Sequence, residues 1–138
     1  MARALVCGML ALALAGCGNP ALGASGPALH VTRTGWRLPP LDVTVTNAAR
    51  VRRLSDAALA LRKVPEGAVF ACPIDFGTEY HLTFTAHNSP PTEMSLDGAG
   101  CRFLNIEPSG PGYFQTDAFR ALFSQVTGIA PIDVRPEG

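Results

Sequence analysis

Apolar and polar residues alternate along the chain with two periods, and each period predicts one kind of element. A period of two predicts strands, because successive side chains of a strand point to opposite faces. The predicted strands are residues 41–46, residues 80–86, a short return strand over 94–96, and residues 101–106. We expect Pro90 and Pro91 to turn the chain after the second strand, and residues 98–100 to form a tight turn before the last.

Apolar residues at helical spacing predict two helices. The first begins at Asn47, which can act as the N-cap, and ends before residues 65–67, where Pro and Gly interrupt the pattern. Its predicted apolar face consists of Val51, Leu54, Ala58 and Leu61. The second begins at Thr116 and stops at Gly128. Its apolar face consists of Phe119, Leu122, Phe123 and Val126.

These elements follow the order β-α-β-β-β-α and predict an α+β fold. An antiparallel sheet packed against two helices, with one face covered, buries the apolar residues of all six elements. At 138 residues the chain is long enough for one such domain. We place this domain at residues 32–130 and a C-terminal tail at residues 131–138.

The first residues of the chain predict export. Arg3 precedes an apolar run over residues 4–13, which has the length of a signal-peptide core and is too short to span a bilayer as a helix. The run ends in Leu14-Ala15-Gly16-Cys17. This tetrapeptide resembles the lipobox of bacterial lipoproteins, in which an apolar residue and two small residues precede the cysteine that receives the lipid.

The resemblance to a lipobox implies a signal peptide over residues 1–16 and a lipidated Cys17 as the first residue of the mature chain. Residues 17–31 have several Gly and Pro residues and no sustained apolar period, so we predict a flexible tether. The acyl chains would hold the protein on the outer (extracytoplasmic) face of the cell membrane. A soluble secretory signal is the alternative, because residues 13–15 also fit the small-x-small cleavage pattern.

The four cysteines divide by position. Cys7 leaves with the signal peptide, whereas Cys72 and Cys101 lie inside the domain and are predicted to form a disulfide. Cys17 is then the odd cysteine. Lipidation accounts for it, because a free exposed thiol is a liability in an oxidising compartment.

Charge predicts which partners the domain can bind. Eleven basic and eleven acidic residues leave no basic excess, so we predict no nucleic-acid partner. Arg50, Arg52 and Arg53 gather in the first turns of the first helix, where the helix dipole disfavours positive charge. They are candidates for binding anionic headgroups, an anionic envelope polymer or an acidic protein. We favour the other interpretation, a solvated face on which Arg52 pairs with Asp56.

Trp36, the only tryptophan, is a further candidate for binding. It either caps the core or forms an exposed anchor for a partner. We favour the core position, because large aromatic residues are highly buried on average.

Catalytic and metal-binding patterns are sparse. Asp75 could join Glu79 or Asp97 as the carboxylate pair of a hydrolase, although Asp beside Gly more often stabilises a turn. No serine lies in a nucleophile elbow, and no glycine-rich loop has phosphate-binding spacing. The histidines are His30, His81 and His87. Their wide spacing predicts no metal site, and we expect no cofactor.

A second resemblance rests on four segments of the chain. They are the first helix with its end at residues 65–67, segment 72–77, strand 80–84 and residues 100–102. In these positions the chain resembles small uncharacterised exported proteins of high-GC Gram-positive bacteria. The resemblance covers about residues 41–128 and implies the scaffold and the disulfide, without an activity. We therefore expect a membrane-anchored lipoprotein that is not an enzyme but a small binding or interaction module of the cell envelope. An envelope hydrolase using acidic residues near Asp75 is the alternative.

Overall fold

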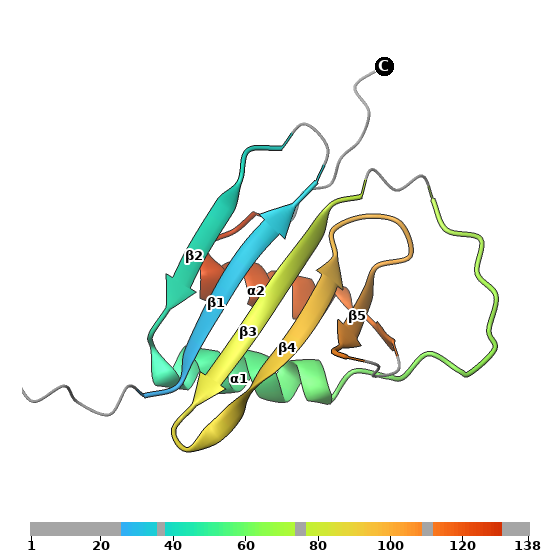
Figure 1. Cartoon of the computed structure of the whole chain (residues 1–138). Helices are drawn as coiled ribbons and strands as arrows, with labels where there is room; N and C mark the ends of the chain where they lie inside the picture. The colour runs from blue at the N-terminus through green and yellow to red at the C-terminus, as the bar shows by residue number, and fades with distance from the viewer. Residues whose placement is uncertain (1–25, 36–37, 74–76, 109–111, 131–138) are drawn as a thin grey trace, which may run out of the picture.

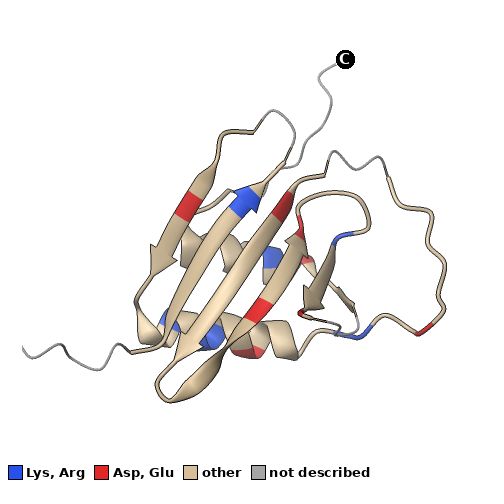
Figure 2. Cartoon of the chain, viewed as in Figure 1, with Lys and Arg blue, Asp and Glu red and all other residues tan. Residues whose placement is uncertain are grey.

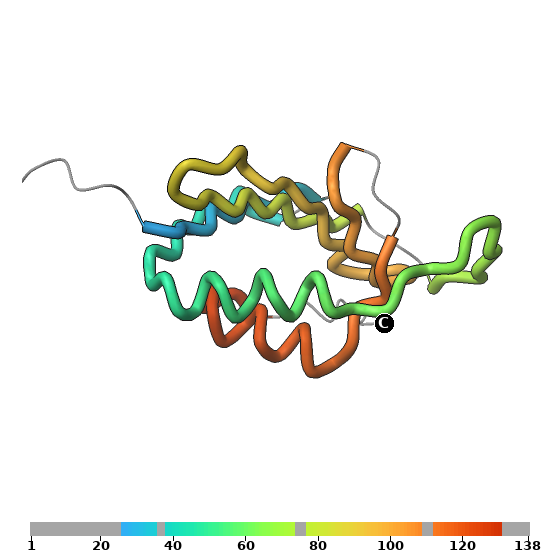
Figure 3. The backbone as a smooth tube through the Cα atoms, turned by 90° about the horizontal axis from the view of Figure 1, so that it is seen from below, coloured from blue at the N-terminus to red at the C-terminus, as the bar shows by residue number. Residues whose placement is uncertain are grey.

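The computed structural model describes residues 26–35, 38–73, 77–108 and 112–130. In chain order the elements are β1 (Ala28–Thr34), β2 (Leu41–Val45), α1 (Ala48–Leu59), β3 (Glu79–Ala86), β4 (Ser89–Asp97), β5 (Phe103–Ile106), β6 (Tyr113–Phe114) and α2 (Asp117–Thr127). The strands build one antiparallel sheet in the order β2-β1-β3-β4-β5-β6 (Figure 1). Both helices cover the same face of this sheet (Figure 3). The predicted α+β fold is therefore confirmed.

The hydrophobic core lies between the sheet and the two helices. In β3 the core side chains are Tyr80, Leu82 and Phe84, whereas the intervening His81 is exposed. This is the period of two that the sequence predicted. The largest fully buried side chains are Leu29, Val31, Leu54, Leu82, Met94 and Leu104. Burial of one such side chain stabilises the fold by about 1.5–3 kcal/mol.

Both predicted helices form, and their predicted caps are confirmed. The Asn47 side chain accepts a hydrogen bond from the Arg50 amide at 3.0 Å. The Thr116 hydroxyl accepts one from the Phe119 amide at 3.1 Å. Gly128 ends α2 with a φ of 75°, in the left-handed region that favours glycine.

Helix α1 ends at Leu59, before the stop that we predicted at residues 65–67. Tertiary contacts explain the early end, because the chain leaves the helix to run beside β6. There the Val64 amide donates to the Gly112 carbonyl at 2.7 Å. Leu61, predicted on the apolar helix face, packs half-buried against the core from outside the helix.

The predicted tether over residues 17–31 is wrong for its last residues, which belong to β1. Leu29 and Val31 are fully buried, and β1 pairs with both β2 and β3. The folded domain therefore begins at about Ala28 rather than at the predicted Thr32. Two buried residues between Gly and Pro residues are too few to give a recognisable period of two. Pairing of β1 with strands on both of its edges supplies the stability that the local sequence pattern lacks.

The predicted element order is present, with β1 added before it and the two-residue β6 added before α2. The predicted turn at Pro90 and Pro91 is wrong. The chain turns at residues 87–88, where Asn88 has a φ of 60°, and both prolines lie inside β4. Proline has no amide hydrogen to donate, so it fits where a strand is not fully paired. Here β5 pairs only with Met94–Leu96, and the pairing of β4 with β3 has a register shift opposite the prolines.

Candidate functional site

The structure describes some of the candidate site residues and not others. Cys17, Trp36 and Asp75 lie outside the described residues. The candidates that the structure describes are Arg50, Arg52, Arg53, Cys72, Glu79, Asp97 and Cys101. The arginines lie on α1, whereas both carboxylates lie on the sheet.

Charged residues divide unequally between the two layers of the domain (Figure 2). The helices carry Arg50, Arg52, Arg53, Asp56, Asp117 and Arg120. The strands carry Arg33, Asp42, Glu79, Glu93 and Asp97. The basic excess of the domain therefore lies on the helices and the acidic excess on the sheet. The helix layer is therefore the more positive of the two layers, although the whole chain has no net charge.

The three arginines of α1 do not form one cluster. Arg50 and Arg53 are three residues apart and share a face of the helix. Both line a groove between α1 and α2, and the rest of its lining is Leu122, Gln125 and Val126. Arg52 instead lines a separate groove beside the hairpin of β3 and β4. Two of the three candidate arginines therefore line the same groove.

The groove between α1 and α2 presents two basic side chains and one amide side chain. It encloses about 290 Å³. Arg50, Arg53 and Gln125 are all exposed, so their donor groups are accessible from solvent. A guanidinium group presents N–H donors in a planar fork that matches a carboxylate or a phosphate.

The predicted ion pair between Arg52 and Asp56 does not form. Within the described residues, carboxylates pair with His30 and His81, and neither pair includes Arg52. Both Arg52 and Asp56 are exposed. An exposed pair at this spacing contributes only about 0.3–0.5 kcal/mol, which is too little to fix two long side chains.

Glu79 and Asp97, the carboxylates of the hydrolase alternative, lie directly opposite each other on β3 and β4. Directly opposite side chains share a face, with Cβ atoms about 4.5–5.5 Å apart. That face is the one away from the helices, because the next pair along the strands, Tyr80 and Leu96, is buried in the core. The structure therefore places Glu79 and Asp97 at opposed positions on one face of the sheet.

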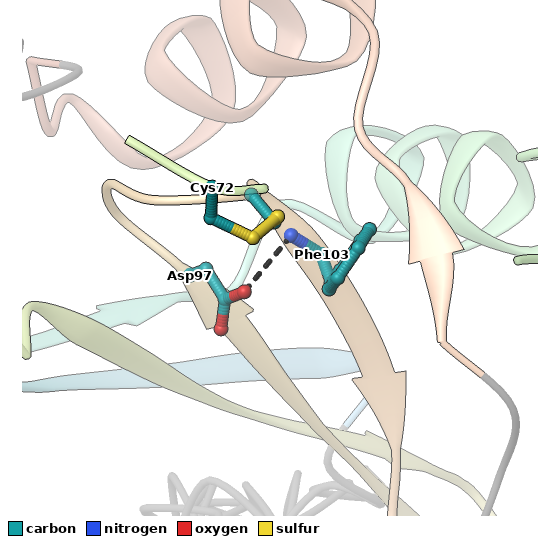
Figure 4. Close-up of a disulfide and its surroundings, with 4 residues drawn as sticks. Cys72, Asp97 and Phe103 are labelled. Atoms are coloured by element: carbon teal, nitrogen blue, oxygen red, sulfur yellow. Dashed lines mark hydrogen bonds between the residues drawn. A yellow bond between two sulfur atoms is a disulfide. The ribbon is translucent and has the colours of Figure 1, made fainter. Parts of the chain in front are cut away.

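Asp97 also has a structural role (Figure 4). One of its carboxylate oxygens accepts a hydrogen bond from the Phe103 amide at 3.0 Å. Its backbone carbonyl accepts another from the Gln115 side chain at 2.9 Å. Asp97 thereby holds the start of β5 and the segment before α2 in place.

The histidines lie in strands of the sheet and in the turn between β3 and β4 rather than in a common site. His30, predicted in the tether, lies in β1 with Nε2 2.9 Å from Asp42 Oδ1. His81 lies in β3 with Nε2 3.8 Å from Glu79 Oε2, and His87 lies in the turn that follows. Among the described residues, no three His, Cys, Asp or Glu side chains are grouped closely enough to hold a metal ion.

The predicted disulfide between Cys72 and Cys101 is confirmed (Figure 4), with Cα atoms 4.8 Å apart. It joins the long segment between α1 and β3 to the turn between β4 and β5. Three phenylalanines near this bond escaped the sequence analysis: Phe70, Phe103 and Phe114. The available signal was a pair of large apolar residues, Val69 and Phe70, inside a segment without strand or helix periodicity.

No protein-family model, curated protein or solved structure matches this chain. The architecture alone defines its class, an α+β domain with a six-stranded antiparallel sheet, two helices on one face and one disulfide. Within the part of the chain that the structure describes, no helix is both long enough and apolar enough to cross a bilayer.

Proposed function

We propose that this chain is a lipoprotein held on the outer (extracytoplasmic) face of the cell membrane by lipid on Cys17. The apolar run over residues 4–13 and the lipobox-like tetrapeptide that ends at Cys17 support the anchor. The disulfide between Cys72 and Cys101 supports a location outside the cytoplasm, because disulfides form and persist where the environment is oxidising.

In this proposal the domain is a small non-catalytic binding module for anionic groups of an envelope protein or polymer. The observation that carries the binding role is the groove in which Arg50 and Arg53 of α1 meet Gln125 of α2. A hydrogen bond to a charged group contributes about 1.5–3 kcal/mol. Two guanidinium groups in one groove can therefore select an anionic group over a neutral one.

Charge reversal at the groove tests the binding role. We expect Arg50→Glu combined with Arg53→Glu to lower the amount of envelope ligand captured by at least about tenfold, the change that 1.4 kcal/mol produces. The measurement is affinity capture from native envelope, with the captured components quantified against those of the unchanged protein.

The chain offers a matched control for this experiment. Arg52→Glu makes the same change of charge on the same helix as Arg53→Glu, but outside the groove between the helices. We expect Arg53→Glu alone to weaken capture and Arg52→Glu to leave it unchanged. Equal losses in the two single variants, or identical captured components for the double variant and the unchanged protein, would contradict the proposed site.

An envelope hydrolase is the second candidate function. The direct opposition of Glu79 and Asp97 favours it, because two neighbouring carboxylates can act as the acid and base of glycoside hydrolysis. If the domain hydrolyses an envelope glycan, Glu79→Gln is expected to lower the rate by about 10²–10⁴-fold without changing side-chain size. A wild-type protein that releases no reducing ends from purified envelope glycan rules this candidate out.

A further inference from the structure

The segment between α1 and β3 displays large apolar side chains to solvent. We call residues 65–73 the apolar loop. Val69 is 96% exposed and Phe70 is 40% exposed, and Leu59 at the end of α1 is the other large hydrophobic residue that the described chain exposes. A valine that is almost fully exposed beside a part-exposed phenylalanine is a candidate for contact with a membrane or a partner.

A cluster of aromatic rings holds the apolar loop against the sheet. The ring of Phe70 meets the rings of Phe103 and Phe114 edge to face, with centroids 5.4 and 5.5 Å away. Phe103 and Phe114 contact each other at 5.6 Å. Phe70 therefore serves as an anchor on its inner side, while its neighbour Val69 projects into solvent.

Both ends of the loop are also fixed. Before it, the Val64 amide donates to the Gly112 carbonyl at 2.7 Å. At its far end, Cys72 is bonded to Cys101. Val69 lies between these two attachments. Its exposure is therefore a property of the fold rather than of a frayed segment.

Basic residues surround the base of the loop. The Arg62 guanidinium lies 4.7 Å from the centroid of one β6 ring, and the Lys63 ammonium lies 5.9 Å from the other. Arg102, exposed beside the disulfide, is the third basic residue, and the acidic residues are Glu66 and, beside the disulfide, Asp97. Three basic residues against two acidic residues leave an excess of one positive charge among the described residues, so this end of the domain favours an anionic surface over a cationic one.

We propose that the apolar loop inserts Val69 into the interface of an anionic phospholipid membrane, with the part-exposed Phe70 beside it. Aliphatic and aromatic side chains enter the boundary between headgroups and acyl chains, and basic side chains beside them contact anionic headgroups. The inference rests on the proposed anchoring at Cys17, which would place this loop within reach of the same bilayer.

Charge and shape favour a lipid bilayer over a protein as the binding partner of the apolar loop. A second copy of the loop would bring like charges together, because the same basic residues surround it. One projecting valine and one part-exposed phenylalanine offer far less than the roughly 800 Å² per partner of a stable protein interface. A bilayer interface adapts to a small projection and needs no complementary pocket.

The loop and the start of β1 lie at opposite ends of the domain in two perpendicular views (Figures 1 and 3). Ten residues separate Cys17 from Ala28, and a chain of that length reaches at most about 35 Å. Lipid at one end and the apolar loop at the other would therefore attach the domain to the membrane at two points and lay it lengthwise on the surface.

A polarity-sensitive fluorophore on the loop tests this orientation. The mature protein carries the label at Ala68→Cys, next to the native Val69, and is bound to vesicles that contain anionic phospholipid. We expect its emission to shift to shorter wavelength and to gain intensity. The same label at Thr44→Cys, on the exposed side of β2, is expected to keep the emission found in water.

A substitution in the loop provides the control. Val69→Asp is expected to return the label at position 68 to its emission in water, whereas Thr44→Asp leaves the shift intact. Val69 is almost fully exposed, so this change does not disturb the core. In protein that lacks acyl chains, Val69→Asp is expected to weaken partitioning into anionic vesicles by at least about tenfold.

The two proposals fail separately. A label at position 68 that stays in water while acylated protein is bound to the vesicles overturns the loop inference and leaves the anchor intact. If Cys17 proves to be unmodified, the loop is tested without the lipid anchor: the emission of the same label is measured after the protein is added to preformed vesicles. A shift that is equally large without anionic lipid also overturns the role assigned to Arg62, Lys63 and Arg102.

Discussion

Replacing both Cys72 and Cys101 with serine is expected to lower the free energy of unfolding by about 3–4 kcal/mol. The bond links residues 29 positions apart, and its loss returns that much conformational freedom to the unfolded chain. In the folded state it fixes a long segment without regular structure to the turn between β4 and β5. Small domains have a total stability of only about 5–15 kcal/mol, so this loss is a large fraction.

Urea denaturation followed by circular dichroism measures the change. The same loss corresponds to a decrease in Tm of about 15–25 °C for a domain near 100 residues. Ala71→Ser combined with Ala99→Ser places two serines beside the bond without breaking it, and is expected to change stability by less than about 0.5 kcal/mol. A decrease below about 1 kcal/mol in the cysteine variant would show that the bond does not constrain the fold.

Replacing Cys17 with serine is expected to end stable attachment to the membrane. The serine cannot carry the diacylglyceryl group, so the chain is released into the medium or remains as an uncleaved precursor. Each methylene buried in the bilayer contributes about 0.8 kcal/mol, so acyl chains supply nearly all of the expected binding. Immunoblots of membrane and medium fractions measure the change.

Cys7→Ser is the control for this experiment. It removes a cysteine from the same N-terminal region, but from the predicted signal peptide. We expect it to leave processing and membrane attachment unchanged. A Cys17→Ser chain that is processed normally and stays on the membrane would contradict the anchor.

The fold was predictable where the local pattern and the tertiary structure agree. The alternation in β3 and the caps at Asn47 and Thr116 follow from the sequence, and the structure confirms them. β1 was missed because its core residues, Leu29 and Val31, are only two and their burial depends on pairing with distant strands. Neighbouring Pro and Gly residues masked them further.

The arrangement of the candidate site was less predictable, because it depends on packing and register. Helical spacing alone places Arg50 and Arg53 on one face, but the other wall of their groove comes from α2, which only the packing of the helices brings near. The opposition of Glu79 and Asp97 depends on the turn at residues 87–88. The pattern of residues predicted that turn at the prolines, and a wrong turn gives a wrong register.

Acylation of Cys17 is the claim on which both the membrane address and the orientation of the loop depend. Intact-mass and N-terminal peptide mass spectrometry of the mature protein, isolated from membranes, tests it directly. The expected product begins at Cys17 and carries a diacylglyceryl group on its sulfur. A mature chain that begins at another residue, or one with an unmodified thiol at Cys17, would contradict it.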